Sequence, residues 1–342
     1  NVAESTLSTE KGDVVHRTSG RRLKYGALVD KAAALPVPKT IALKDPKDFK
    51  VLGQSLPRLD IPEKVNGKAE FGLDVKRPGM LTARVVRCPV FGGKVATFNA
   101  EKAKAVAGVR HVVAISTGIA VVADNYWAAS KGAQALEVKW DEGALAKLNS
   151  ADISRKYAEL AGQPGKVARN DGDTAAALKS AATSFERVFE VPFLAHACME
   201  PMNCTADVKA DRCDVWVPTQ GQTASQQAAM AASGLPADKV HIFTTYLGGG
   251  FGRRGEADFV IDAVETSKAV GKPVKVVWTR EDDIQHDYYR PVTYVRMWGA
   301  VDGPKKPVAF VQRMVQQSLM KRIGVLPPNG IDFISLEGAA NL

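Results

Sequence analysis

The chain has 342 residues, of which 45% are hydrophobic and 24% are charged, a composition typical of a globular protein with room for two or three domains. This composition excludes a disordered protein, and the lack of any apolar run of about 18 residues predicts no membrane-spanning helix. The net charge of +9 arises from basic residues scattered among acidic ones, as in residues 44–48, which indicates a solvated surface and no nucleic-acid partner.

The four cysteines, Cys88, Cys198, Cys204 and Cys213, lack C-x-x-C spacing. The sequence therefore predicts neither a zinc site nor an iron–sulfur cluster within this chain. Scattered buried thiols are the expected state, and their placement leaves the cellular compartment open.

Four segments are predicted along the chain. Residues 1–55 are polar and punctuated by prolines, with one short helical stretch between Tyr25 and Ala34, and are predicted to be a connector. Residues 56–143 are predicted to form a compact α/β domain, residues 144–184 a linker with helices, and residues 185–342 a further domain. The elements predicted in the α/β domain are a strand at residues 81–87, a short helix from Asn99 to Gly108, strands at 109–115 and 119–123, a helix at 126–135 capped by Asp124 or Asn125, and a strand at 136–140.

Polar residues are predicted at two strand ends in the last segment. His196 and Glu200 could serve as metal ligands or as an acid–base pair, but a single histidine among apolar residues is more often a core residue, and the structural interpretation is favoured. Gln220 and Gln222 could donate to a ligand oxygen, or they could cap the helix predicted at residues 225–233.

A glycine-rich turn follows the strand predicted at residues 240–246. Glycine reaches positive φ at little cost, so consecutive amide groups in such a turn can point at an anion; the alternative is an ordinary tight turn. A helix is predicted after it, with Asp258 in its first turn and Gly271 as its stop signal, and a second strand begins at Val274. The turn consists of Gly248, Gly249, Gly250, Phe251 and Gly252, followed by Arg253 and Arg254.

A dinucleotide fold is a second interpretation of this unit. Gly250, Gly252 and Gly255 satisfy the G-x-G-x-x-G pattern, and acidic residues follow the next strand, although later than the roughly 20 residues that the pattern expects. A P-loop is excluded because no Gly-Lys-Ser or Gly-Lys-Thr closes the turn.

Three motifs, at residues 195–201, 218–220 and 247–254, resemble in order and spacing the molybdenum-binding subunit of the xanthine oxidase family. Residues 60–140 are similar to the α/β hammerhead domain of that family. Residues 199–206 and the double arginine most resemble the isoquinoline 1-oxidoreductase β-subunit and the large subunit of membrane-linked aldehyde dehydrogenases. The resemblance implies an α+β fold, in which the hammerhead domain precedes the first part of a molybdopterin-binding domain with mixed sheets and helices.

The resemblance also implies a cofactor and a set of contacts. The cofactor would be molybdenum–molybdopterin cytosine dinucleotide, with the amides of residues 248–252 beside the metal's oxo group and the pterin. Arg253 and Arg254 would neutralise cofactor charge, and Gln220 and Gln222 would line the cofactor region. Arg290, His196 and Glu200 would lie near the substrate pocket, although Arg290 could equally be a surface residue. No side chain is expected to ligate the metal.

The implied reaction is the hydroxylation of an aldehyde or an N-heterocycle with oxygen from water. Its glutamate base is not expected in this chain, and Glu200, Glu256 and Glu337 are not assigned to it. The chain is about half the length of a complete subunit, so we expect either a fragment that starts and stops within a longer polypeptide or a split subunit completed by a companion chain.

Electrons would leave to a two-cluster iron–sulfur subunit, with a cytochrome c subunit beyond it. The expected location is the periplasm, with the cytoplasm as the alternative. Two other functions stay open: a nicotinamide-dependent dehydrogenase that uses Gly250, Gly252 and Gly255, and a non-catalytic cofactor-binding chain. The sequence leaves the small-molecule substrate undetermined.

Overall fold

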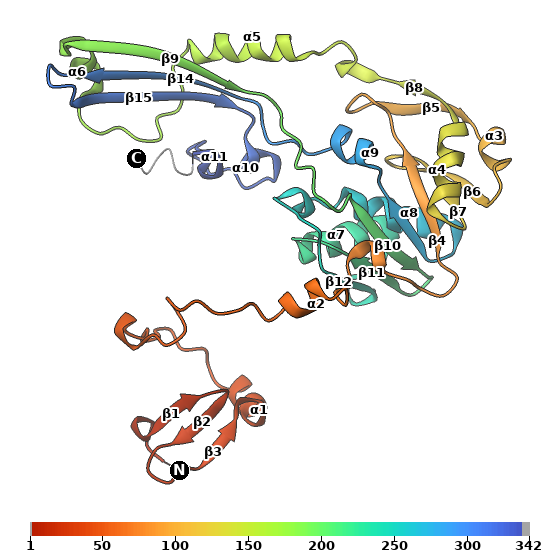
Figure 1. Ribbon diagram of the computed structural model, residues 1–342, viewed down its shortest axis with the longest axis horizontal. Coiled ribbons are helices and arrows are strands. Elements are labelled where there is room, and N and C mark those ends of the chain that lie inside the picture. Colours follow the sequence, from red (N-terminus) through yellow and green to blue (C-terminus); the bar gives the residue numbers. More distant parts are fainter. Residues whose placement is uncertain (1, 337–342) are drawn as a thin grey trace. The chain divides into compact units, whose positions relative to one another are not determined.

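The computed structural model describes residues 2–336 (Figure 1). The chain forms two compact units, one that extends to Gly67 and one that begins at Lys68. No helix among the described residues is long and apolar enough to cross a membrane. Glu337, which the sequence left unassigned, lies outside the described residues.

The first unit contains a small antiparallel sheet that the sequence did not predict. Its strands β1 (Leu7–Glu10), β2 (Asp13–His16) and β3 (Arg22–Lys24) pair in the order β1-β2-β3. Lys11 and Gly12 join the first two strands with positive φ values of 49° and 85°. Strands of three or four residues show little alternation, which is why the sequence predicts only a connector here. The predicted helical stretch is present as the 3₁₀ helix η2 (Tyr25–Leu28) and α1 (Val29–Ala33), and η1 (Glu4–Thr6), η3 (Pro46–Asp48) and α2 (Ile61–Val65) complete the unit.

A seven-stranded mixed sheet dominates the second unit, in the order β12-β11-β10-β13-β4-β7-β6. Strand β13 pairs in parallel with β4 and antiparallel with β10. The strands of the predicted α/β domain therefore lie together at one end of a sheet that continues into the later segment, and the domain boundaries stay predictions. The strands are β4 (Leu81–Val86), β6 (Val109–Ile115), β7 (Gly118–Ala123), β10 (Asn203–Val208), β11 (Cys213–Val217), β12 (Val240–Thr244) and β13 (Val274–Val277).

Strand β7 explains why the two segments share one core. All six of its residues are buried, and hydrophobic clusters cover both of its faces. Ala120 and Val122 belong to the main core with Phe259 of α8 (Asp258–Val270), whereas Ala123 packs with Ala128 of α4 (Tyr126–Ala135). Burial on both faces is what makes a strand uniformly apolar rather than alternating.

The helix predicted after the glycine turn is confirmed as α8. Gly271 ends it in the left-handed conformation with φ of 65°, and Asp258 and Lys268 lie in its first and last turns. Both charges are placed to complement the helix dipole. Asn125 caps α4 by accepting a hydrogen bond from Ala128 N, as predicted.

The dinucleotide interpretation is contradicted by the topology of the sheet. Strands β12 and β13, which flank the glycine turn and α8, are separated by β11 and by β10, and β10 runs antiparallel to both of its neighbours. A dinucleotide fold instead places such strands in a parallel sheet.

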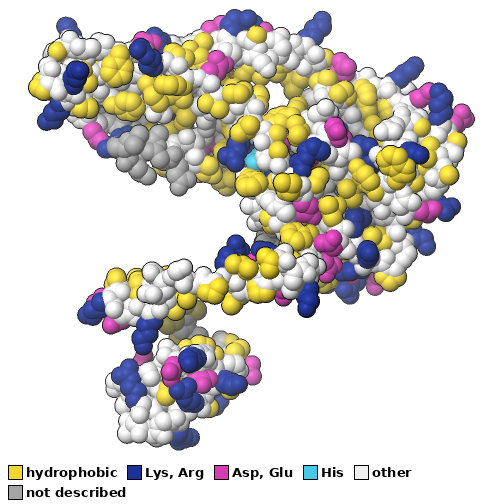
Figure 2. All heavy atoms as spheres, viewed as in Figure 1, with side chains coloured by type: hydrophobic (Ala, Val, Ile, Leu, Met, Phe, Trp, Pro, Cys, Tyr) yellow, Lys and Arg dark blue, Asp and Glu magenta, His cyan; other side chains and the backbone are white. Residues whose placement is uncertain are grey.

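A second sheet, in the order β15-β14-β9, carries α5 and α6 (Figure 1). Its strands are β9 (Thr183–Val191), β14 (Thr293–Val301) and β15 (Pro307–Gln316). Hydrophobic side chains gather on the surface over this sheet (Figure 2). The remaining elements are the ribbon of β5 (Lys94–Asn99) and β8 (Glu137–Asp141), the 3₁₀ helices η4 (Gly72–Asp74), η5 (Gly143–Leu145), η6 (Ala237–Lys239) and η7 (Arg253–Gly255), and the helices α3 (Glu101–Lys104), α5 (Ser150–Ala161), α6 (Thr174–Ser180), α7 (Gln222–Ser233), α9 (Arg280–Gln285), α10 (Leu319–Arg322) and α11 (Phe333–Leu336).

Candidate functional site

The glycine loop, residues 248–252, leaves the end of β12 in a conformation that few side chains tolerate. Gly249 and Gly252 have φ values of 96° and 103°, and between them Phe251 is held at 54°. A left-handed conformation costs a residue with a Cβ about 1–2 kcal/mol. Phe251 is nevertheless 65% exposed, so burial of its ring offsets little of that cost. Strain of this kind clusters at ligand-binding segments.

Two of the glycines lie close to neighbouring side chains, and at Gly248 the neighbour is the Cβ of the buried Glu200. A Cβ at Gly248 would lie 2.4 Å from Glu200 Cβ, and a Cβ at Gly250 would lie 2.4 Å from Gln220 Oε1. The same Gln220 oxygen accepts a hydrogen bond of 3.0 Å from Gly252 N. The structure thus brings Gln220 to the loop, and its role in lining the cofactor region stays a prediction.

The loop also carries amides without protein partners. Within residues 2–336, the backbone N–H groups of Gly249, Gly250 and Phe251 form no hydrogen bond with the protein. Successive amides in such a left-handed turn can converge on an anionic oxygen. The loop is therefore equipped to bind an oxyanion through its backbone.

The two arginines that follow the loop are buried beneath it, with 1% and 0% of their surfaces exposed. Arg253 donates to both oxygens of Asp258 at 2.9 and 2.8 Å, and its Nε lies 3.0 Å from Asp287 Oδ1. Burial alone would lower the pKa of Arg253, but the hydrogen bonds and charge of Asp258 raise it. This arginine is committed to carboxylates of the protein itself.

Arg254 anchors the loop from below. Its guanidinium donates to Gly249 O at 2.7 Å, to Glu200 O at 2.6 Å and to Glu200 Oε2 at 3.1 Å. Burial lowers the pKa of Arg254, against the opposing charge of Glu200. Both arginines are thus paired with carboxylates of the protein, and their predicted role in neutralising cofactor charge stays a prediction.

Glu200 is likewise a structural anchor. Besides Arg254, its carboxylate accepts hydrogen bonds from Leu73 N at 3.1 Å, Asn203 Nδ2 at 3.0 Å and Gly248 N at 2.9 Å. The predicted place at a substrate pocket does not fit these contacts, because four donors saturate this buried carboxylate.

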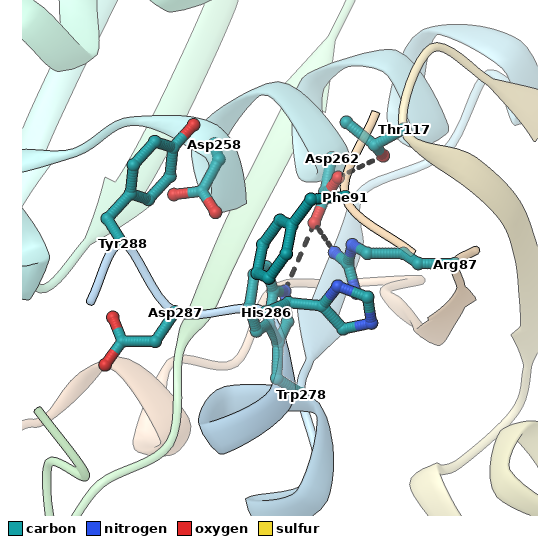
Figure 3. Close-up of a pocket in the computed structure, with 9 residues that line it drawn as sticks. All are labelled: Arg87, Phe91, Thr117, Asp258, Asp262, Trp278, His286, Asp287 and Tyr288. Carbon is teal, nitrogen blue, oxygen red and sulfur yellow. Dashed lines mark hydrogen bonds and ion pairs between the residues drawn. The ribbon is translucent and has the colours of Figure 1, made fainter. Parts of the chain in front are cut away.

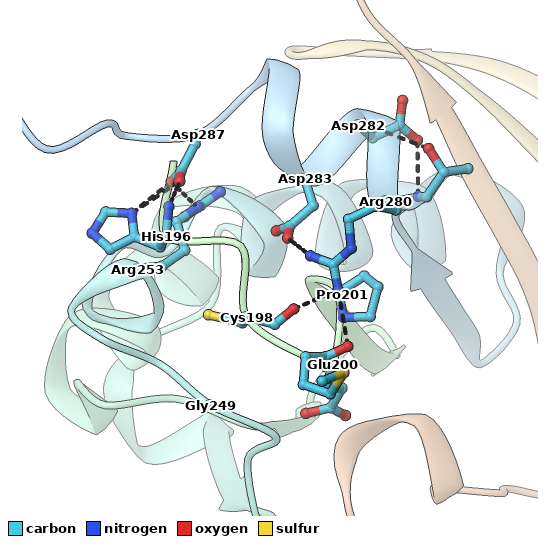
Figure 4. Close-up of polar contacts among 12 residues, drawn as sticks. His196, Cys198, Glu200, Pro201, Gly249, Arg253, Arg280, Asp282, Asp283 and Asp287 are labelled. Carbon is cyan, nitrogen blue, oxygen red and sulfur yellow. Dashed lines mark hydrogen bonds and ion pairs between the residues drawn. The ribbon is translucent and has the colours of Figure 1, made fainter. Parts of the chain in front are cut away.

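His196 lies beside the loop and is held by Asp287 (Figure 4). Its backbone N donates to Asp287 Oδ2 at 2.5 Å, and its Nδ1 lies 2.9 Å from the same oxygen. A Cβ at Gly252 would lie 3.7 Å from His196 Nε2, so the far ring nitrogen faces the loop. Asp287 thereby joins His196 to Arg253 in one buried cluster.

Gln222 and Arg290 are not brought to the loop by any hydrogen bond or ion pair in the described chain. Gln222 is exposed in the first turn of α7, for which Gly221 is the N-cap. Arg290 is exposed, and its backbone pairs with Leu194 at 3.0 and 3.4 Å. For Arg290, this environment agrees with the surface interpretation.

A cavity of about 280 Å³ has Asp287 among its lining residues, and the sequence did not predict it (Figure 3). At its base, Asp262 pairs with Arg87, accepts from Thr117 Oγ1 at 2.5 Å and accepts from Trp278 Nε1 at 3.1 Å. Burial raises the pKa of Asp262 in spite of these partners. The sequence signal that could have indicated this cavity is Asp262, a charged residue on the apolar face of α8. The lining residues are Arg87, Phe91, Thr117, Asp258, Asp262, Trp278, His286, Asp287 and Tyr288.

Comparison with known proteins identifies the family of this domain. Residues 160–317 match the family model of the molybdopterin cofactor-binding domain. The isoquinoline 1-oxidoreductase subunit beta of Brevundimonas diminuta is 31% identical over 355 aligned residues, covering 88% of this chain and 44% of that protein. The membrane-bound aldehyde dehydrogenase (pyrroloquinoline-quinone) of Gluconacetobacter polyoxogenes is 31% identical, covering 85% of this chain and 40% of that protein.

Solved structures show the same fold. Quinoline 2-oxidoreductase from Pseudomonas putida 86 superposes with a TM-score of 0.60 at 18% identity, covering 78% of this chain and 39% of that one. The aldehyde oxidoreductase from Desulfovibrio gigas gives a TM-score of 0.59 at 19% identity, covering 85% and 37%.

The chain therefore belongs to the xanthine oxidase family of molybdopterin oxidoreductases, and residues 160–317 are its molybdopterin cofactor-binding domain. It spans less than half the length of the two curated relatives.

The described residues fit this cofactor through backbone groups. The unpartnered amides of Gly249, Gly250 and Phe251 are suitable donors for cofactor oxygens, whereas the neighbouring arginines are already paired. Among residues 2–336, no group of three or more His, Cys, Asp or Glu side chains is arranged to hold a metal ion. Contact with the cofactor would thus come from the loop.

Proposed function

We propose that this chain is the cofactor-binding part of a molybdenum hydroxylase that oxidises an aldehyde or an N-heterocycle, with water as the source of oxygen. The observation that carries the proposal is the strained glycine loop with its unpartnered amides, in a domain of the molybdopterin-binding family. The names of the relatives, an isoquinoline oxidoreductase and an aldehyde dehydrogenase, support this substrate class.

The bound cofactor would supply the two-electron oxidation. The chain's own contribution is to hold and orient it: Gly249, Gly250 and Phe251 donate backbone hydrogen bonds, and Gln220 fixes Gly252 in place. Arg254 and Glu200 hold the loop from below, so the donors are positioned before the ligand arrives.

The proposal extends to the dinucleotide form and to partners. We infer a cytosine dinucleotide on the pterin, a two-cluster iron–sulfur subunit as electron acceptor, a cytochrome c subunit beyond it, and a periplasmic location. The remainder of the subunit, or a companion chain, would supply the glutamate base. Several relatives are named as subunits, which supports a multi-subunit assembly.

Elemental analysis of the complex purified from its source tests the proposal. Molybdenum should be close to stoichiometric with the chain, and acid treatment should release CMP. Release of another nucleotide with molybdenum present would overturn only the cytosine form. Absence of molybdenum and pterin from the freshly isolated complex would overturn the proposed function itself.

A further inference from the structure

The sheet β15-β14-β9 has two faces of different character, and one of them is covered by a helix. On that face Ala300 is buried, and Arg313 Nη1 donates to Ala161 O at the end of α5 at 3.0 Å. Helix α5 packs against β14 and β15. At the outer strand β9, where the same face is exposed, Glu186 pairs with Arg296. This face is therefore apolar beneath the helix and carries paired charges where it meets solvent.

The opposite face is apolar where it is exposed. Phe185, Phe189 and Val191 of β9 and Phe310 of β15 each expose about half of their surface. The ring of Phe185 lies over Gly299, because a Cβ at that glycine would be 2.5 Å from Phe185 Cζ. We call this side of the sheet the open face; the rows of residues that cross it are Phe185–Gly299–Phe310, Arg187–Met297–Gln312, Phe189–Val295–Met314 and Val191–Thr293–Gln316.

The composition of the open face is that of a surface that is covered in the complete molecule. A solvated face of an antiparallel sheet is normally polar, whereas Arg187 is the one charged residue in these rows. Three phenylalanines, each with about half of a roughly 200 Å² side chain exposed, present about 300 Å² of apolar surface. A patch of that size on a monomer is often an interaction site, and an interface this apolar is typical of permanent contacts.

We propose that the open face is the docking surface for the completing segment, by which we mean the part of the molybdenum subunit that aligns with no residue of this chain. This inference rests on the proposed function, because it takes the chain to be one part of such a subunit. The chain covers 44% of the isoquinoline 1-oxidoreductase subunit beta and 39% of quinoline 2-oxidoreductase, so more than half of each polypeptide has no counterpart here. The sheet lies within residues 160–317, so the open face belongs to the cofactor-binding domain itself.

The charge of Arg187 favours this occupant over a second copy of the chain. Within residues 2–336 Arg187 has no ion pair, and its Nη1 donates to the carbonyl oxygen of Glu186 at 2.7 Å. A symmetric contact between two copies would pair the open face with itself and would supply no counter-charge for this arginine. A different polypeptide can place a carboxylate opposite Arg187, which removes the cost of burying an unpaired charge.

Photo-crosslinking in the complex purified from its source tests the proposal. Benzoylphenylalanine in place of Phe189 keeps an aromatic ring on the open face, and the same residue in place of Val188 is the matched control. The two positions are neighbours on β9 with side chains on opposite faces, and they are 52% and 47% exposed. Irradiation should join position 189, but not position 188, to a peptide of the completing segment, as read by mass spectrometry. A crosslink from position 189 to a second copy of this chain or to another subunit, or equal crosslinking to the completing segment from both positions, would overturn the inference.

Thiol labelling gives a second measurement with smaller substitutions. The four native cysteines are buried, so a maleimide should react first at the cysteine of Phe189→Cys or Val188→Cys. In the native complex Phe189→Cys should react about 10-fold or more slowly than Val188→Cys, and the two should react alike after unfolding in urea.

Equal labelling rates in the native complex, or the lack of any crosslink from position 189, would contradict a covered open face. Absence of molybdenum from the unsubstituted complex would instead overturn the proposed function and leave the protection of position 189 unchanged. The two failures are therefore distinguishable.

Discussion

The glycine loop and the 3₁₀ helix η7 are consecutive in sequence, yet the structure places them in opposite environments. In the loop, Phe251 is 65% exposed and three amides have no protein partner among the described residues. In η7, Arg253 and Arg254 are almost completely buried and paired with carboxylates. One continuous motif therefore has two roles: the amides of the loop are left available for the ligand that we propose, and the charged side chains of η7 support the loop.

The largest effect is expected when Arg254, one of the buried arginines of η7, loses its charge. Arg254→Met leaves the buried Glu200 without its cation and leaves carbonyls of Gly249 and Glu200 without donors. Breaking a buried ion pair costs about 3–5 kcal/mol, and urea unfolding should show a loss of that size. Arg290→Met, at an exposed arginine, is the control and should change the free energy of unfolding by less than about 0.5 kcal/mol. A comparable loss in the control would show that Arg254 has no special role.

A smaller effect is expected from a methyl group added at Gly248, where the loop packs against the buried Glu200. Gly248→Ala brings a Cβ within 2.4 Å of Glu200 Cβ, whereas a Cβ at Gly255 would have no atom within 4 Å. Overpacking at Gly248 should cost about 1–3 kcal/mol and lower the molybdenum content of the complex. Gly255→Ala should change neither the free energy of unfolding nor the molybdenum content. Neither glycine has a positive φ, so the pair compares packing alone, and equal losses would contradict the close contact.

His286, which lines the cavity, should make the free energy of unfolding depend on pH. Burial lowers the pKa of His286 below its usual 6.5, so the unfolded chain binds a proton more readily than the folded chain does. Stability from this residue is complete above about pH 6.5 and is lost as pH falls toward the lower folded value. Urea midpoints between about pH 5 and 7 should therefore fall on acidification, and His286→Gln should reduce that slope. If the urea midpoint of His286→Gln depends on pH as strongly as that of the unsubstituted chain, His286 is not the cause of the pH dependence.

The smallest effect is expected at the exposed ring of the loop. Phe251→Ala removes a side chain that is 65% exposed but keeps the backbone N–H. The free energy of unfolding should change by less than about 0.5 kcal/mol, and the molybdenum content should be retained. A complex that loses molybdenum would show that the ring, and not the amide alone, contacts the cofactor.

Local patterns were sufficient for several elements of the second unit. Gly271 at the end of α8, Asn125 before α4 and the uniformly apolar strand β7 could all be predicted from neighbouring residues, because caps and periodicity are properties of a short stretch of chain. The short strands β1 to β3 escaped prediction because three or four residues carry too little pattern. The order of strands in the large sheet is a long-range property, which is why β4 and β13 were assigned to different domains.

The sequence by itself determined the family and the place of the glycine loop, because motif spacing and glycine's conformational freedom are local. Only the tertiary structure decided the roles of the charged residues. Asp287 lies 34 residues beyond Arg253 and 91 beyond His196, and Glu200 lies 54 residues before Arg254. Whether an arginine faces a ligand or a buried carboxylate depends on such distant partners, because burying a charge is tolerated only where the fold supplies its counter-charge.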